Sequence, residues 1–228
     1  MLDVLSTWSQ VSTNRAITYR WFANLFALEL REEQLVLYQG DKAEPLLSIL
    51  SSIGLDDEVE RFRQAVHSWT GVKHMRLELA ADFAQMFLLD AKTACIPYAS
   101  AYLDRGELYG SATQLMRNIM RDNQLEIPAE FKEPADHLAV ILSVMATWIE
   151  KEQASAQDRE QWSETVKFQH NFVQEMLMSF LPEFARRSQL IQVSNDFYPA
   201  VCALLLAYVE ADLGYLRICL EDDSVLVD

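Results

Sequence analysis

The chain has 228 residues, of which 50% are hydrophobic and 11% aromatic, so it can bury a sizeable core. Its formal net charge of −15 disfavours binding to nucleic acid or to anionic membranes; the charge would attract a basic peptide or simply keep the protein soluble. Only 6 Gly and 6 Pro are present, too few for the turns of a β-sandwich or barrel, and composition therefore favours an all-α fold.

In the first half of the chain, apolar residues recur at helical spacing. This periodicity predicts helices over residues 13–30, 32–38, 44–53, 56–69, 73–89 and 110–123. Residues 90–109 lack it and contain Pro97 and Gly106, so they predict a long loop of the kind that is often functional.

The second half begins with a linker over residues 123–134, which holds Pro128, Pro134 and three glutamates. Helices are predicted after it over residues 135–152, 158–181, 182–191 and 196–220. Together, about ten helices predict a bundle-like fold with an N-terminal part (1–122), a hinge (123–134) and a C-terminal part (135–228). Such a hinge would let two copies exchange their C-terminal parts, which predicts a domain-swapped homodimer.

The cysteines, the N-terminal residues and the longest apolar stretch indicate the cellular compartment. Cys95, Cys202 and Cys219 form no CxxC pair and are odd in number, which favours a reducing environment. The first ten residues lack the basic segment of a signal peptide. The apolar stretch 201–209 is about half as long as a membrane span and is expected to be a buried core helix. We therefore expect a cytoplasmic protein.

Common catalytic motifs are missing from the sequence: it has no GxxxxGK(S/T), GxGxxG, HExxH or GxSxG pattern, and none of its four histidines belongs to an ExxH pair. Glu133, Asp136 and His137 would be close neighbours on a helix and could form part of a metal site. Alternatively, Pro134 and Asp136 simply begin the next helix. Helix initiation does not explain His137, which could instead hydrogen-bond to a partner, and both interpretations remain open.

Aromatic residues are frequent at helical spacing, and most are expected in the core. Trp21 lies off the stripe formed by Tyr19, Phe22 and Phe26. A groove lined by a few of these rings would suit an apolar helical peptide.

Four segments, in this order and at these separations, carry a family resemblance. They are RLELAADF at 76–83, PYASAY at 97–102, EPADHLA at 133–139 and LPEF at 181–184. They resemble the TorD type within the TorD, DmsD and NarJ family of redox-enzyme maturation chaperones, over roughly residues 15–216. One departure is that Met86 and Phe87 lead into Leu88 and Leu89, where many members have a glycine.

The resemblance implies an all-helical chaperone without catalytic activity. Such proteins bind the twin-arginine signal peptide and the unfinished body of a molybdenum-cofactor reductase, which for the TorD type is trimethylamine-N-oxide reductase. They keep it competent for cofactor insertion before export. The resemblance implies no cofactor except weak GTP binding, which no feature of this sequence supports.

The resemblance and the aromatic pattern together give the expected client-binding residues. These are Glu133, Asp136, His137, Pro97, Ser100, Tyr102, Trp21, Phe22, Phe83 and Phe87. Two other functions remain as alternatives, a helical metal- or cofactor-binding enzyme and a general acidic adaptor.

Overall fold

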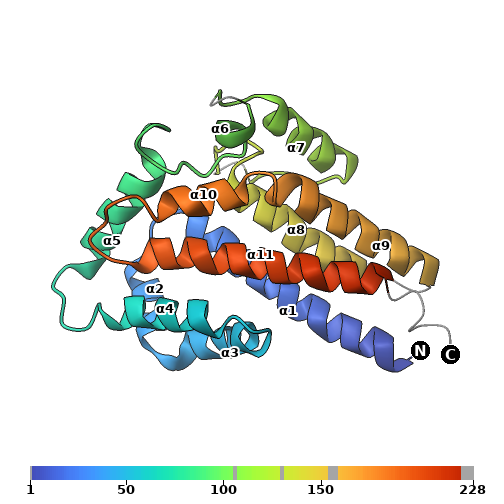
Figure 1. The fold of residues 1–228 in the computed structure, drawn as a ribbon, viewed down its shortest axis with the longest axis horizontal. Coiled ribbons are helices and arrows are strands. Elements are labelled where there is room, and N and C mark those ends of the chain that lie inside the picture. Colours follow the sequence, from blue (N-terminus) through green and yellow to red (C-terminus); the bar gives the residue numbers. More distant parts are fainter. Residues whose placement is uncertain (1, 105–106, 129–130, 154–158, 222–228) are drawn as a thin grey trace.

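The computed structural model describes residues 2–104, 107–128, 131–153 and 159–221, and in these ranges regular structure is helical apart from one isolated β-bridge (Figure 1). This confirms the predicted all-α class. Residues 105–106 of the predicted loop and 129–130 of the predicted linker lie outside these ranges.

The helices of the first half are α1 (Leu2–Ala27), α2 (Glu32–Gln39), the 3₁₀ turn η1 (Asp41–Ala43), α3 (Glu44–Ser52), α4 (Asp56–His67), α5 (Met75–Phe83), its π-helical continuation η2 (Ala84–Leu88), α6 (Ser100–Leu103) and α7 (Ser111–Asp122). Those of the second half are α8 (Leu138–Gln153), α9 (Arg159–Phe172), its π-helical continuation η3 (Val173–Leu177), α10 (Leu181–Ser188) and α11 (Phe197–Glu221).

Local sequence explains several helix ends. α4 begins with the run Asp56, Asp57 and Glu58, whose negative charges favour a helix N-terminus. Gly54, between α3 and α4, has a φ of 88°, and Gly71, after α4, has a φ of 78°, both of which suit glycine because it has no Cβ.

Three long helices form the centre of the molecule. α1 packs lengthwise against α8, and α11 lies across the assembly in contact with α4, α9 and α10 (Figure 1). α11 is long and apolar enough to cross a membrane, but 61% of its most apolar 18-residue window is buried inside the protein. It is thus a core helix, as expected for residues 201–209.

A buried ion pair joins α1 to α11. The Arg15 guanidinium meets the Asp212 carboxylate through Nε–Oδ1 at 2.5 Å and Nη2–Oδ2 at 3.0 Å. Tyr19 donates its hydroxyl to Asp212 Oδ2 at 2.8 Å, and Arg15 Nη1 donates to Gln169 Oε1 on α9 at 2.8 Å. Both charges are therefore paired and hydrogen-bonded, as buried charges need to be.

Two predicted helix starts were wrong. α1 begins at residue 2 instead of 13, and α8 begins at Leu138 instead of 135. The long loop also contains the short helix α6. One apolar core cluster includes both Phe22 of the N-terminal part and Leu142 of the C-terminal part. The division into parts 1–122 and 135–228 stays a prediction.

Candidate functional site

The predicted loop and the segment before α8 are paired through their backbones. Ala99 N donates to Asp136 O at 3.1 Å, Leu138 N donates to Pro97 O at 2.8 Å, and Tyr98 forms an antiparallel bridge with His137. This pairing takes up backbone groups of residues 136–138, which explains why Asp136 and His137 precede α8 instead of forming its first turn. The interpretation of Asp136 as a first-turn residue is therefore wrong.

The Asp136 side chain completes this connection, which we call the latch (residues 97–100, Thr113 and 133–138). Asp136 is fully buried, and its Oδ2 accepts the Ser100 backbone N–H at 2.9 Å. Its Oδ1 accepts the hydroxyl of Thr113, on α7, at 2.6 Å. One carboxylate thus ties α6 and α7 to the start of α8, with a donor on each oxygen. Sequence reasoning missed Thr113, because a single helical threonine carries no signal of its own.

His137 is buried in the latch, with 4% of its surface exposed. Burial lowers the pKa of His137 to about 4, although the charges of Glu133 and Asp136 oppose this shift. The side chain is therefore neutral near pH 7. Its Nδ1 accepts the Ala139 N–H at 3.1 Å, which assigns the proton to Nε2.

Aromatic rings enclose the imidazole. The centroid of the Tyr98 ring lies 5.0 Å from that of His137, and the centroid of the Phe131 ring lies 5.4 Å from it, both edge to face. The Tyr98 hydroxyl donates to Glu133 Oε2 at 2.7 Å. The pKa of Tyr98 is raised mainly by its burial, and further by its hydrogen bond to Glu133. The structure thus brings together five of the predicted site residues, namely Pro97, Ser100, Glu133, Asp136 and His137.

The other predicted residues lie elsewhere. Tyr102 packs against Phe180 and Phe184, and the Arg187 guanidinium carbon lies 5.1 Å from the centroid of its ring. The remaining four predicted residues pack inside the core, three of them buried and the fourth half-buried: Phe22, Phe83, Phe87 and Trp21. These rings do not line the apolar groove described next, and their role in client binding stays a prediction.

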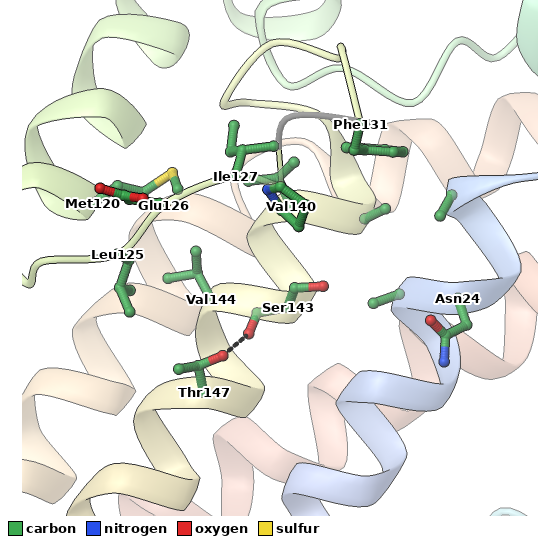
Figure 2. Close-up of a pocket in the computed structure, with 14 residues that line it drawn as sticks. Asn24, Met120, Leu125, Glu126, Ile127, Phe131, Val140, Ser143, Val144 and Thr147 are labelled. Atoms are coloured by element: carbon green, nitrogen blue, oxygen red, sulfur yellow. Dashed lines mark hydrogen bonds between the residues drawn. The ribbon is translucent and has the colours of Figure 1, made fainter.

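An apolar groove lies beside the latch, between α1, α8 and the linker (Figure 2). Its volume is about 310 Å³. Small side chains of α1 and α8 form its floor, and the linker and α7 supply larger apolar ones. The lining residues are Ala23, Asn24, Ala27, Met120, Leu125, Glu126, Ile127, Pro128, Phe131, Ala139, Val140, Ser143, Val144 and Thr147.

Phe131 connects the two features, since it lines the groove and contacts the His137 ring of the latch. The groove could have been predicted from the linker sequence, in which the large apolar residues Leu125, Ile127 and Phe131 are spaced among mostly polar residues. A more open depression adjoins the groove and shares Met120, Leu125, Glu126 and Ile127 with it. Glu133, Arg117 and Arg121 also line this depression.

The described residues include no group of three His, Cys, Asp or Glu placed to hold a metal ion. In the latch, moreover, Asp136, His137 and Glu133 already take part in hydrogen bonds, whereas the buried Ser100 hydroxyl has no partner among the described residues. Asp136 accepts two hydrogen bonds, His137 accepts one at Nδ1, and Glu133 accepts one from Tyr98. The arrangement fastens segments together and presents an apolar surface beside them.

Comparison with known proteins identifies the family. A family model described as nitrate reductase delta subunit matches residues 52–186, more than half of the chain. The TorD chaperone of Psychrobacter sp. (strain PRwf-1) is 37% identical over 94% of this chain and 95% of its own length. The chain belongs to the TorD family of chaperones. It is thus a soluble chaperone and not an enzyme, as the four sequence segments led us to expect.

The similarity to further relatives also covers nearly the whole chain. The TorD chaperone of Actinobacillus pleuropneumoniae serotype 7 (strain AP76) is 35% identical over 89% of this chain and 96% of its own length. The TorD chaperone of Vibrio vulnificus (strain YJ016) is 35% identical over 89% of this chain and 94% of its own length. The TorD likeness therefore extends through both the latch and the groove.

Proposed function

We propose that this TorD-family chaperone works in the cytoplasm on the precursor of a molybdenum-cofactor reductase, with trimethylamine-N-oxide reductase as the client. It binds the twin-arginine signal peptide and the unfinished enzyme body, and keeps the client competent for cofactor insertion before export. The observation that carries this proposal is the apolar groove next to the latch, on a chain of net charge −15.

A signal peptide matches these two properties. It has a basic segment followed by an apolar segment of about 7–15 residues. The groove offers a place for apolar side chains, and the negative charge of the chaperone attracts the basic segment. Burying three apolar side chains would contribute about 5–9 kcal/mol before the costs of ordering the peptide.

Calorimetric titration tests the proposal. The chain is titrated with the twin-arginine signal peptide of trimethylamine-N-oxide reductase and with a scrambled peptide of equal charge and hydrophobicity, each at two salt concentrations. We expect selective binding with a negative heat-capacity change and a weaker affinity at high salt. Equal affinity for both peptides would favour a general acidic adaptor instead.

The homodimer is a separate part of the proposal. Because the linker joins α7 to α8, and α8 packs along α1, exchange of the C-terminal parts would place α8 of one copy on α1 of the other. Light scattering at rising concentration is expected to reveal a dimer. A monomer at every concentration would contradict it.

We also propose that the chaperone needs no resident cofactor. Weak GTP binding rests on family resemblance alone, and equilibrium dialysis with labelled GTP checks it. Stoichiometric nucleotide on the purified protein would contradict this part of the proposal.

A further inference from the structure

The groove beside the latch is already partly filled by the chain itself. Leu125, Ile127 and Phe131 of the linker are half-buried and pack against the core cluster along the groove. Figure 2 shows the linker running over α8, with Ile127 above Val140 and Leu125 beside Val144.

The space that the linker leaves open in the groove is limited. A volume of 310 Å³ corresponds to roughly ten water molecules at about 30 Å³ each. Two or three side chains fit into this space, and Leu125 and Ile127 occupy part of the surface that a longer apolar segment would contact.

The part of the linker before the latch, residues 123–128 and 131–132, is held differently from the latch. In the described residues, its backbone hydrogen bonds are local: Leu125 N donates to Met120 O at 2.8 Å, and Phe131 N donates to Pro128 O at 2.9 Å. The latch, by contrast, joins distant segments through their backbones. The linker therefore rests on α1 and α8 mainly through apolar side chains, which another apolar segment can replace.

We infer that the face of α1 and α8 beneath the linker is the docking surface for the client's apolar segment, and that the linker side chains Leu125 and Ile127 compete with the client for it. This inference rests on the proposed function. In the free chaperone the linker shields the surface from water. On binding, the client's apolar segment replaces Leu125 and Ile127 on this surface.

The competition predicts opposite effects from two kinds of substitution. The double variant L125S/I127S weakens the hold of the linker and is expected to raise the affinity for the signal peptide by about 3- to 30-fold. V144T adds a hydroxyl to the floor and is expected to lower that affinity. L115S changes an exposed leucine on α7 and is expected to have no effect; Leu115 is 47% exposed.

The same peptide titration measures all three variants, after cooperative urea unfolding has confirmed that each is folded. I127A replaces the double variant if that one unfolds. A fall in affinity for the linker variants would mean that the linker forms part of the client site, and an unchanged affinity would mean that it does not compete. Either result overturns the inference and leaves the proposed function standing.

A second readout does not depend on the client. An apolar fluorescent dye is added to each folded chain, and L125S/I127S is expected to bind more dye than the wild type, whereas L115S is not. If no chain distinguishes the signal peptide from its scrambled control, the proposed function fails. The docking surface then fails with it, even if the dye shows that the linker shields α1 and α8. An unchanged dye signal overturns the inference whatever the peptide titration gives.

Discussion

The Phe131 ring lies edge-on against the His137 imidazole, with their centroids 5.4 Å apart, and also forms part of the wall of the apolar groove. A residue at the centre of the latch is thereby connected to the surface proposed to receive the client. His137 is too buried to be a main contact for a peptide. Its influence on binding is expected to pass through Phe131.

The stability of the protein should depend on pH through His137. Its pKa is about 4 in the folded protein, against 6.5 as its ordinary value. The unfolded chain therefore takes up this proton at a higher pH than the folded one, so stability falls as pH decreases from about 6.5 to 4. At about 1.4 kcal/mol per pKa unit, the loss attributable to His137 is on the order of 3 kcal/mol.

Urea unfolding at pH 7.5, 6.5, 5.5 and 4.5 measures this loss. H137N removes the titrating ring but keeps an oxygen able to accept the Ala139 N–H, so its stability should fall less steeply than that of the wild type. H67N is the control, since His67 is exposed, and it should follow the wild-type curve. Parallel curves for wild type and H137N would contradict the assignment.

Thr113 should matter for stability out of proportion to its size. T113V leaves the buried Asp136 Oδ1 without the hydroxyl that lies 2.6 Å away. We expect a loss of about 1–3 kcal/mol, because a buried charged group loses a partner. T113S keeps the hydroxyl and should lose much less. Denaturant unfolding compares the two variants, and equal stabilities would show that the hydroxyl does not support Asp136.

The Arg15–Asp212 pair should show strong coupling. R15M or D212L alone leaves one buried charge unpaired, at an expected cost of about 3–5 kcal/mol. The double variant should cost clearly less than the sum of the two single variants. A double-mutant cycle of unfolding free energies measures the coupling. Additive effects would mean that the two side chains do not depend on each other.

Gln124 should tolerate glycine better than its neighbour does. Its φ is 54°, at the turn where α7 leads into the linker. Q124G should stabilise the protein by up to about 1 kcal/mol, because a left-handed residue with a Cβ is strained. N123G is the control: Asn123 has a φ of −101° and its side chain donates to Ile119 O, so this variant should be destabilised. If both variants lost stability, the backbone at Gln124 would not be strained.

Most helices could be predicted because their apolar stripes repeat every three to four residues. The start of α8 could not, because Pro134 and Asp136 look locally like the beginning of a helix. The tertiary pairing of residues 97–99 with 136–138 overrides that local preference. The family motifs placed Asp136 and His137 together, but only the structure shows that they are buried.

The groove was harder to predict than the fold. Its floor consists of small residues such as Ala27 and Ser143, which line the groove from helices far apart in sequence. Small side chains carry no signal until the helices are packed. The predicted aromatic groove used Phe22 and Phe87 instead, and these rings pack within the core because large apolar side chains gain most from burial.

Photo-crosslinking tests the central claim most directly. The signal peptide carries a benzophenone group in its apolar segment, and the linked residues are located by mass spectrometry. The account predicts links to α8 over residues 139–147 and to α1 around Ala23 and Ala27, suppressed by excess unlabelled peptide. The account would be contradicted if the links formed only to other surfaces and formed equally with the scrambled peptide.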